Sequence, residues 1–208
     1  MERDNNPLQY GLQPYNNGRI QTFLENGVFI VPQGVEEIYA SGSGGGGGGG
    51  TAASGSGSAI AAGAWGAWSC IKKKLIVAPG MAIPITIGLG GIAEVAGGDT
   101  LIGDLLTIPG GLAGVHATTG TSQPQIQTST PANIVDGLVS SIPPSLWGAS
   151  TCGSGTLFAA PRFSVVTAAD VAGSPGFKYG GGGSAGRRAT AGTSVGGKGG
   201  DGIAIIEW

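Results

Sequence analysis

The feature that most constrains this chain is its polyglycine. Seven consecutive glycines occupy Gly44–Gly50, and further glycine-rich stretches follow at Gly180–Gly183 and Gly196–Gly202. Glycine accounts for 44 of the 208 residues, several-fold more than the usual share of about 7%. Residues without side chains bury little apolar surface. If the chain folds, much of its interior must therefore consist of backbone packed against backbone.

The rest of the composition indicates whether such a chain folds at all. Glycine-rich, low-complexity chains usually stay disordered, because they cannot bury enough apolar surface to offset the loss of conformational entropy. They are normally also poor in apolar residues and rich in charge. Here 40% of the residues are apolar and only 11% are charged, and the mean hydropathy is positive. The composition favours a folded chain, or one that is stable within an assembly, over a simple linker.

One glycine-rich segment repeats every three residues. Val195, Lys198 and Asp201 are separated from each other by pairs of glycines. Three residues per turn is the period of the polyproline II helix, whose backbone groups form no internal hydrogen bonds and must pair elsewhere when buried. Two arrangements fit the glycine tracts. They form either a bundle of extended polyglycine segments capped by β-strands, or flexible surface loops around a small β-sandwich.

Short runs of apolar and β-branched residues predict β-strands around the glycine tracts. The predicted strands are residues 20–24, 28–31, 35–40, 69–77, 81–89, 100–108 and 203–208. The Asn26-Gly27 pair is a strong local signal for a hairpin joining the first two strands. The predicted fold class is all-β, with small β-sandwich-like strands combined with extended glycine-rich segments of the polyglycine II type.

The chain is expected to divide into an arm and a domain. Residues 1–18 are polar and carry turn signals, which predicts an extended N-terminal attachment arm. Residues 19–208 are expected to form a glycine-rich β domain. Within that domain, residues 112–178 lack polyglycine and are expected to form a glycine-poor insertion.

No motif in the sequence makes a convincing catalytic, metal or cofactor site. Residues 192–198 match the start of a phosphate-binding P-loop, but Gly199 stands where the motif requires the Ser or Thr that binds Mg²⁺. Residues 196–204 fit one copy of the nonapeptide calcium repeat, and that kind of site needs successive copies. His116 is the only histidine. We therefore expect no enzymatic activity, no cofactor and no metal. A glycan depolymerase is the alternative enzyme class, and no acid–base pair in the sequence supports it.

Charge and cysteine content exclude other classes. The chain has 10 basic and 12 acidic residues, whereas binding to nucleic acid requires a basic surface. We expect no nucleic-acid partner. Cys70 and Cys152 form either one disulfide or two free thiols, and free thiols are the expectation.

The few aromatic residues are candidates for ligand contacts. Trp65 and Trp68 are three residues apart, which places them on the same face of a three-fold helix. Tryptophan offers a flat apolar platform that suits sugar rings and protein interfaces. The alternative is that the tryptophans cap a core that is poor in side chains. Trp147 follows a proline-rich stretch in the glycine-poor insertion.

The order of these segments resembles a known family. A strand at residues 29–35 precedes the polyglycine tract, residues 77–80 and 85–88 follow in the middle of the chain, and a glycine-rich stretch runs into a last strand ending in Glu207-Trp208. This order is similar to that of the glycine-rich domain of bacteriophage tail fibres and tail adhesins. The resemblance covers residues 20–111 and 180–208.

The resemblance implies a location in the virion tail and a role in recognising the host cell surface. In related adhesins, polyglycine helices form a rigid core and the loops between them touch the receptor. The implied partners are other tail or baseplate proteins and a bacterial surface glycan or outer-membrane protein, and a homotrimer is implied because tail fibres commonly are trimers. The alternative is a structural connector or cap of the fibre or baseplate without receptor contact. The candidate receptor-binding residues are Trp147, Phe158, Phe177, Tyr179, Trp65 and Trp68.

Overall fold

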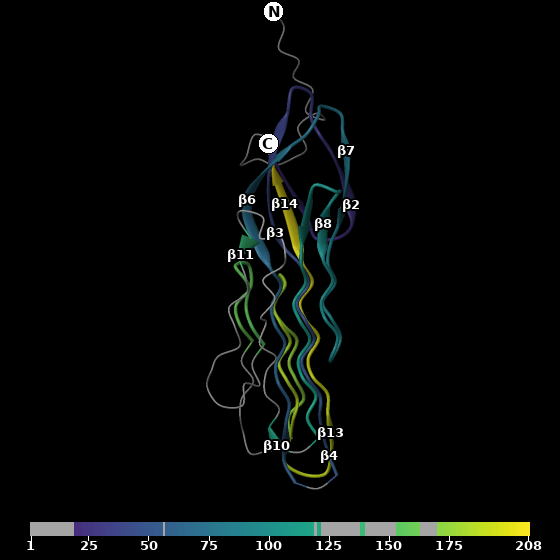
Figure 1. Ribbon diagram of the computed structural model, residues 1–208, viewed down its shortest axis with the longest axis vertical. Helices are drawn as coiled ribbons and strands as arrows, with labels where there is room; N and C mark the ends of the chain where they lie inside the picture. The colour runs from purple at the N-terminus through teal and green to yellow at the C-terminus, as the bar shows by residue number, and fades with distance from the viewer. Residues whose placement is uncertain (1–18, 56, 119, 122–137, 140–152, 163–169) are drawn as a thin grey trace, which may run out of the picture.

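The protein is elongated, with a β-sandwich at one end and a bundle of extended glycine-rich segments at the other (Figure 1). The computed structural model describes residues 19–55, 57–118, 120–121, 138–139, 153–162 and 170–208. The fold is all-β, as predicted. The predicted attachment arm, residues 1–18, lies outside the described residues. Within the described part of the chain, no helix is long and apolar enough to span a membrane.

Two antiparallel sheets form the sandwich. The first has the strand order β1-β14-β3-β6-β11, with the bounds Ile20–Phe23, Ile203–Glu207, Glu37–Ser43, Ser69–Ile76 and Leu138–Val139. The second has the order β2-β7-β8-β9, with the bounds Gly27–Ile30, Ala82–Thr86, Thr100–Ile102 and Leu106–Ile108.

The sandwich is held together by a single apolar core. Alternate residues of the strands point between the sheets, as the two-residue period of a β-strand requires. The largest fully buried apolar side chains in this core are Phe29, Ile38, Ile83, Ile85, Ile102, Ile108, Ile206 and Val31. At the edge of the core, the ring of Trp208 packs on the ring of Phe29, with 5.2 Å between their centroids. This contact joins the end of the chain in one sheet to β2 in the other.

The predicted hairpin between residues 20–24 and 28–31 is wrong. β1 pairs with β14, whereas β2 pairs with β7 in the other sheet. The turn between β1 and β2 carries the chain from one sheet to the other. Phe23 before the turn and Phe29 after it are both buried in the core that the two sheets share. The side-chain oxygen of Asn26 accepts a hydrogen bond from the amide of Ile87 at 2.8 Å, which ties the turn to the far sheet.

The predicted strand at residues 100–108 is instead a tight hairpin. It consists of β8 and β9, which pair in antiparallel register. The turn between them contains Gly103, whose φ of +50° is favourable mainly for glycine. The alternation of buried and exposed residues continues through both strands, so the sequence pattern did not reveal the turn.

Gly44–Gly50 form the centre of the bundle. Their amides donate to three neighbouring segments in turn, and the order repeats every three residues. From Gly45 to Gly50, the acceptors are the carbonyl oxygens of Gly98, Gly200, Trp65, Val95, Gly197 and Ala62. Carbonyl oxygens of the central segment accept from three further segments, through the amides of Gly91, Glu94, Gly111, Gly114, Gly183 and Gly186. The central segment is thus surrounded by six hydrogen-bonded neighbours with a three-residue period, which is the arrangement predicted for polyglycine II.

The close approach of these segments explains why the central tract is pure glycine. A Cβ atom built on any of the seven glycines would lie within 3.0 Å of a neighbouring carbonyl oxygen. The clashing oxygens again follow the three-fold order: those of Leu89, Gly181 and Leu112 face Gly45, Gly46 and Gly47. Even one methyl group would therefore force the segments apart and break the hydrogen bonds between them.

Parts of the predicted glycine-poor insertion also run in the bundle. The amide of Gly114 donates to Gly48, the amide of Ser154 donates to Ala64, and the amide of Gly173 donates to Val195. Residues 112–117, 153–156 and 171–176 therefore add segments to the same lattice.

We predict that Gly48→Ala lowers the free energy of unfolding by about 3 kcal/mol, because the new methyl group overlaps the carbonyl oxygen of Ile92 in a lattice that cannot relax on one side alone. Thermal unfolding followed by circular dichroism measures the change. Gly55→Ala is the matched control, because a Cβ there meets nothing within 4 Å. Equal effects of the two substitutions would contradict the steric account.

Candidate functional site

The loops at the end of the bundle form the candidate site, which we call the distal tip. It comprises the described residues 51–55, 57–60, 117–118, 120–121 and 187–194, at the end of the bundle opposite the sandwich (Figure 1). These residues carry five short strands. These are β4 (Ala52–Ser54), β5 (Ala59–Ile60), β10 (Gly120–Thr121), β12 (Arg187–Arg188) and β13 (Gly192–Ser194). At the opposite end, Ile20 of β1 pairs with Glu207 of β14, so both ends of the described domain lie in the sandwich.

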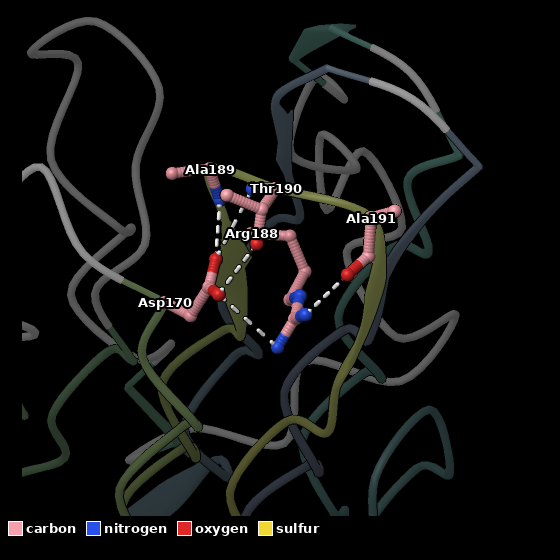
Figure 2. A network of polar contacts seen from close by, with 5 residues as sticks. All are labelled: Asp170, Arg188, Ala189, Thr190 and Ala191. Atoms are coloured by element: carbon pink, nitrogen blue, oxygen red, sulfur yellow. Dashed lines mark hydrogen bonds and ion pairs between the residues drawn. The ribbon is translucent and has the colours of Figure 1, made fainter.

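One polar network fixes the loop between β12 and β13 (Figure 2). The Asp170 carboxylate accepts hydrogen bonds from the amide of Ala189 at 2.6 Å and from the amide of Thr190 at 3.3 Å. It also accepts one from the Thr190 hydroxyl at 2.8 Å. The Asp170 side chain thus satisfies backbone donors at a point where the chain reverses direction and no sheet partner is present.

Arg188 completes the network from the other side of the loop. Its guanidinium lies 3.4 Å from the Asp170 carboxylate and donates a hydrogen bond to the carbonyl of Ala191 at 2.6 Å. The hydrogen bond from the Ala189 amide, those from Thr190 and the nearby Arg188 charge hold the pKa of Asp170 below its ordinary value of 3.8. Asp170 is therefore ionised at neutral pH, and the loop has a defined shape.

Short polar side chains dominate the exposed surface of the distal tip. Ser58, Thr190 and Thr193 are exposed, and a Cβ atom at the neighbouring Gly57 would meet nothing within 4 Å. Hydroxyl and backbone groups of this kind can donate and accept hydrogen bonds. They provide no strong base or nucleophile. Among the described residues, no three His, Cys, Asp or Glu side chains are grouped to hold a metal ion.

His116 lies beside the bundle and is paired with Glu94. Its Nδ1 is 2.8 Å from the Glu94 carboxylate, which also accepts a hydrogen bond from the amide of Thr51 at 3.0 Å. Although burial opposes it, these contacts leave the pKa of Glu94 below its ordinary value. The pair bridges two bundle segments, and no nucleophile motif accompanies it in the sequence.

Trp65 and Trp68 lie in a bundle segment that runs beside the central glycines. Their amides donate to the carbonyls of Leu112 and Pro109, which are also three residues apart. The two side chains are only 9% and 7% exposed. This burial suits the alternative that they cap a core poor in side chains and leaves little of either ring for a receptor to reach.

Three other predicted contact residues gather where the bundle meets the sandwich. The Thr156 hydroxyl donates to the carbonyl of Tyr179 at 2.8 Å and accepts from the amide of Phe158 at 3.1 Å. Phe177 is exposed, and the guanidinium carbon of Arg162 lies 4.8 Å from its ring centroid. The structure therefore brings Phe158, Phe177 and Tyr179 to one region of the flank, away from the distal tip.

Two residues discussed above, Trp147 and Cys152, lie outside the described residues. Cys70 is a buried free thiol in the sandwich core, and burial raises its pKa to about 11.

Sequence reasoning did not identify the Asp170 network. Asp170 and Thr190 are separated by a glycine tract, and no local motif links an aspartate to a loop 20 residues later. Only the return of the chain through the bundle brings them together.

Comparison with known proteins adds no family assignment. No protein-family model matches the chain, and no curated protein has significant sequence similarity to it.

We predict that Asp170→Ala opens the loop between β12 and β13, because the Ala189 and Thr190 amides lose their acceptor. Trypsin should then cleave after Arg188 faster than in the unmodified protein, as mass spectrometry of the fragments would show. Asp104→Ala is the control, because Asp104 is exposed in the β8–β9 turn. Unchanged cleavage after Arg188 would show that the carboxylate does not hold the loop.

The same network predicts a pH dependence. Because the pKa of Asp170 is lowered in the folded protein, its contribution is fully present above the ordinary value of 3.8 and is lost only as the pH falls through the lower folded value. An NMR titration of the Asp170 carboxyl carbon should have its midpoint below 3.8. A midpoint at or above that value would contradict the ionised network.

Proposed function

We propose that this protein is a bacteriophage tail-fibre or tail-tip protein that takes part in recognition of the host cell surface without catalysis. The proposal starts from the resemblance of its segment order to the glycine-rich domain of tail fibres and adhesins. The observation that carries it further is the polyglycine bundle, which separates a sandwich that holds both ends of the described domain from polar loops at the distal tip.

The architecture suits a protein that holds loops away from its point of attachment. The bundle is stabilised by backbone hydrogen bonds between segments that are distant in sequence, and its interior contains almost no flexible side chains. Rigid presentation lowers the entropy lost when loops bind a partner. The sandwich end would join the rest of the tail, and the distal tip would face the cell.

The surface chemistry favours non-covalent binding of polar groups. Exposed Ser and Thr hydroxyls and open backbone at the distal tip offer hydrogen bonds to a surface glycan or to the loops of an outer-membrane protein. The aromatic groups around Phe177 and Tyr179 lie on the flank near the sandwich. We therefore assign the first contact to the distal tip. The region around Phe158, Phe177 and Tyr179, which we call the aromatic flank, is a second contact region.

We predict that the fluorescently labelled protein stains particular bacterial strains and that staining is lost in particular surface-glycan or outer-membrane-protein mutants. Ser58→Lys or Thr193→Lys should weaken staining by about tenfold or more, because each places a charged side chain on the exposed distal tip. Thr107→Lys, on the exposed face of β9 in the sandwich, is the matched control and should leave staining unchanged.

Two outcomes would redirect the proposal. If the distal-tip variants stain as well as the unmodified protein, the contact lies elsewhere, and the aromatic flank is the next region to test. If the folded protein stains no strain of a broad panel, a structural connector or cap of the fibre or baseplate becomes the better account.

A further inference from the structure

A hollow lies where the sandwich meets the bundle, on a different part of the molecule from the distal tip. It has a volume of about 600 Å³. Its lining comes from the β1–β2 turn, the end of β7 and three bundle segments, and includes Leu24, Glu25, Ile87, Leu89, Asp99 and Asp201. The hollow thus combines three apolar side chains with three carboxylates.

The apolar side chains of the hollow continue as a row along the bundle. Leu89 and Ile92 are 68% and 66% exposed, and they are one three-residue turn apart on the same extended segment, about 9 Å along its axis. Val95 follows in a turn closed by a hydrogen bond from its amide to the Ile92 carbonyl at 2.9 Å. With Leu24, which is 55% exposed, these side chains form what we call the flank row.

Lattice packing accounts for the exposure of Leu89 and Ile92 but not for their apolar character. The glycines on either side face other segments: a Cβ at Gly88 would meet Gly98, and a Cβ at Gly90 would meet Gly199. Positions 89 and 92 point to the third, outer side of the segment and could hold any side chain. Exposed apolar groups that lie together in this way, bordered by charge, commonly mark an interaction surface.

The carboxylates around the flank row are only partly neutralised. Asp201 pairs with Lys198, with 3.0 Å between the carboxylate and the ammonium. Asp99 accepts a hydrogen bond from the amide of Gly110 at 2.9 Å. In the described part of the chain, no Lys or Arg forms an ion pair with Glu25 or Asp99. Lys178 also lies close enough to Asp201 for its charge to lower the pKa of that carboxyl. With three carboxylates against two nearby cations, Lys198 and Lys178, the hollow has a net negative charge.

We propose that the hollow and the flank row dock an extended peptide segment of another protein, in which an arginine or lysine is flanked by apolar side chains. The basic side chain enters the hollow beside Glu25 and Asp99, and the apolar side chains cover Leu24, Leu89 and Ile92. Charge complementarity selects this occupant over an acidic or purely apolar one. A bare divalent cation does not fit. Three carboxylates line the hollow, but among the described residues no three acidic, His or Cys side chains are arranged so that they could hold one metal ion together. The proposal does not depend on what the distal tip binds.

The test uses the whole protein and a short capped peptide with one arginine flanked by leucines. Two matched peptides replace the arginine by glutamate or the leucines by serine. We expect saturable binding of the first peptide in fluorescence anisotropy, weakened by added salt, and no saturable binding of the other two. Glu25→Gln and Asp99→Asn should each weaken binding by about two- to fivefold, and Leu89→Ser should do the same or more. Glu36→Gln and Leu157→Ser change an acidic and an apolar exposed residue outside the hollow, and should have no effect.

Three outcomes would overturn the proposal. Equal binding of the arginine and glutamate peptides would show that charge does not select the occupant. Absence of saturable binding up to about 1 mM, the weak end of specific affinities, would remove the site. Concentration-dependent self-association that Leu89→Ser abolishes, measured by sedimentation, would show that a second copy of this chain covers the flank row. Loss of cell staining by the distal-tip variants with unchanged peptide binding would separate this site from the proposed receptor contact.

Discussion

The hydrogen bonds between extended glycine segments determine the rest of this structure. A segment with three residues per turn forms no hydrogen bonds of its own, so every buried amide must find an acceptor on another segment. Successive amides point in three directions, and so do successive carbonyls. The central segment, Gly44–Gly50, can therefore be satisfied only when six other segments surround it, and the chain must cross the bundle repeatedly to supply them.

This geometry also determines which positions of a segment have room for a side chain. A residue that faces a neighbour has no room for Cβ, whereas a residue on the outer side of a peripheral segment is unrestricted. In a peripheral segment the unrestricted position recurs every third residue. Val195, Lys198 and Asp201 follow this rule on one segment, and Leu89 and Ile92 follow it on another. The three-residue period in the sequence therefore indicates which side of each segment faces solvent.

The three-residue period favoured the bundle in the sequence without excluding flexible surface loops, whereas other features gave no sequence signal. The pieces at residues 153–156 and 171–176 lack polyglycine, yet they join the lattice because only their inward-facing positions, such as Gly153, Gly173 and Gly176, need to be glycine. The strand partners could not be predicted either. The chain turns at Asn26 as expected, but β1 and β2 belong to opposite sheets and pair with β14 and β7. The Asp170 network depends on where the bundle returns the chain, which no local pattern encodes.

A lattice of backbone hydrogen bonds separates stability from surface chemistry. In a conventional core the same side chains fill space and shape nearby loops, so changes in a loop often disturb packing. Here the bundle is held mainly by backbone amides and carbonyls, and the loop between β12 and β13 is shaped by its own contacts to Asp170 and Arg188. Side chains exposed at Ser58 or Thr193 make no contribution to the lattice. Loops at the distal tip can therefore change their chemistry while the scaffold beneath them keeps its hydrogen bonds, a property that suits a protein whose proposed partner is a variable cell surface.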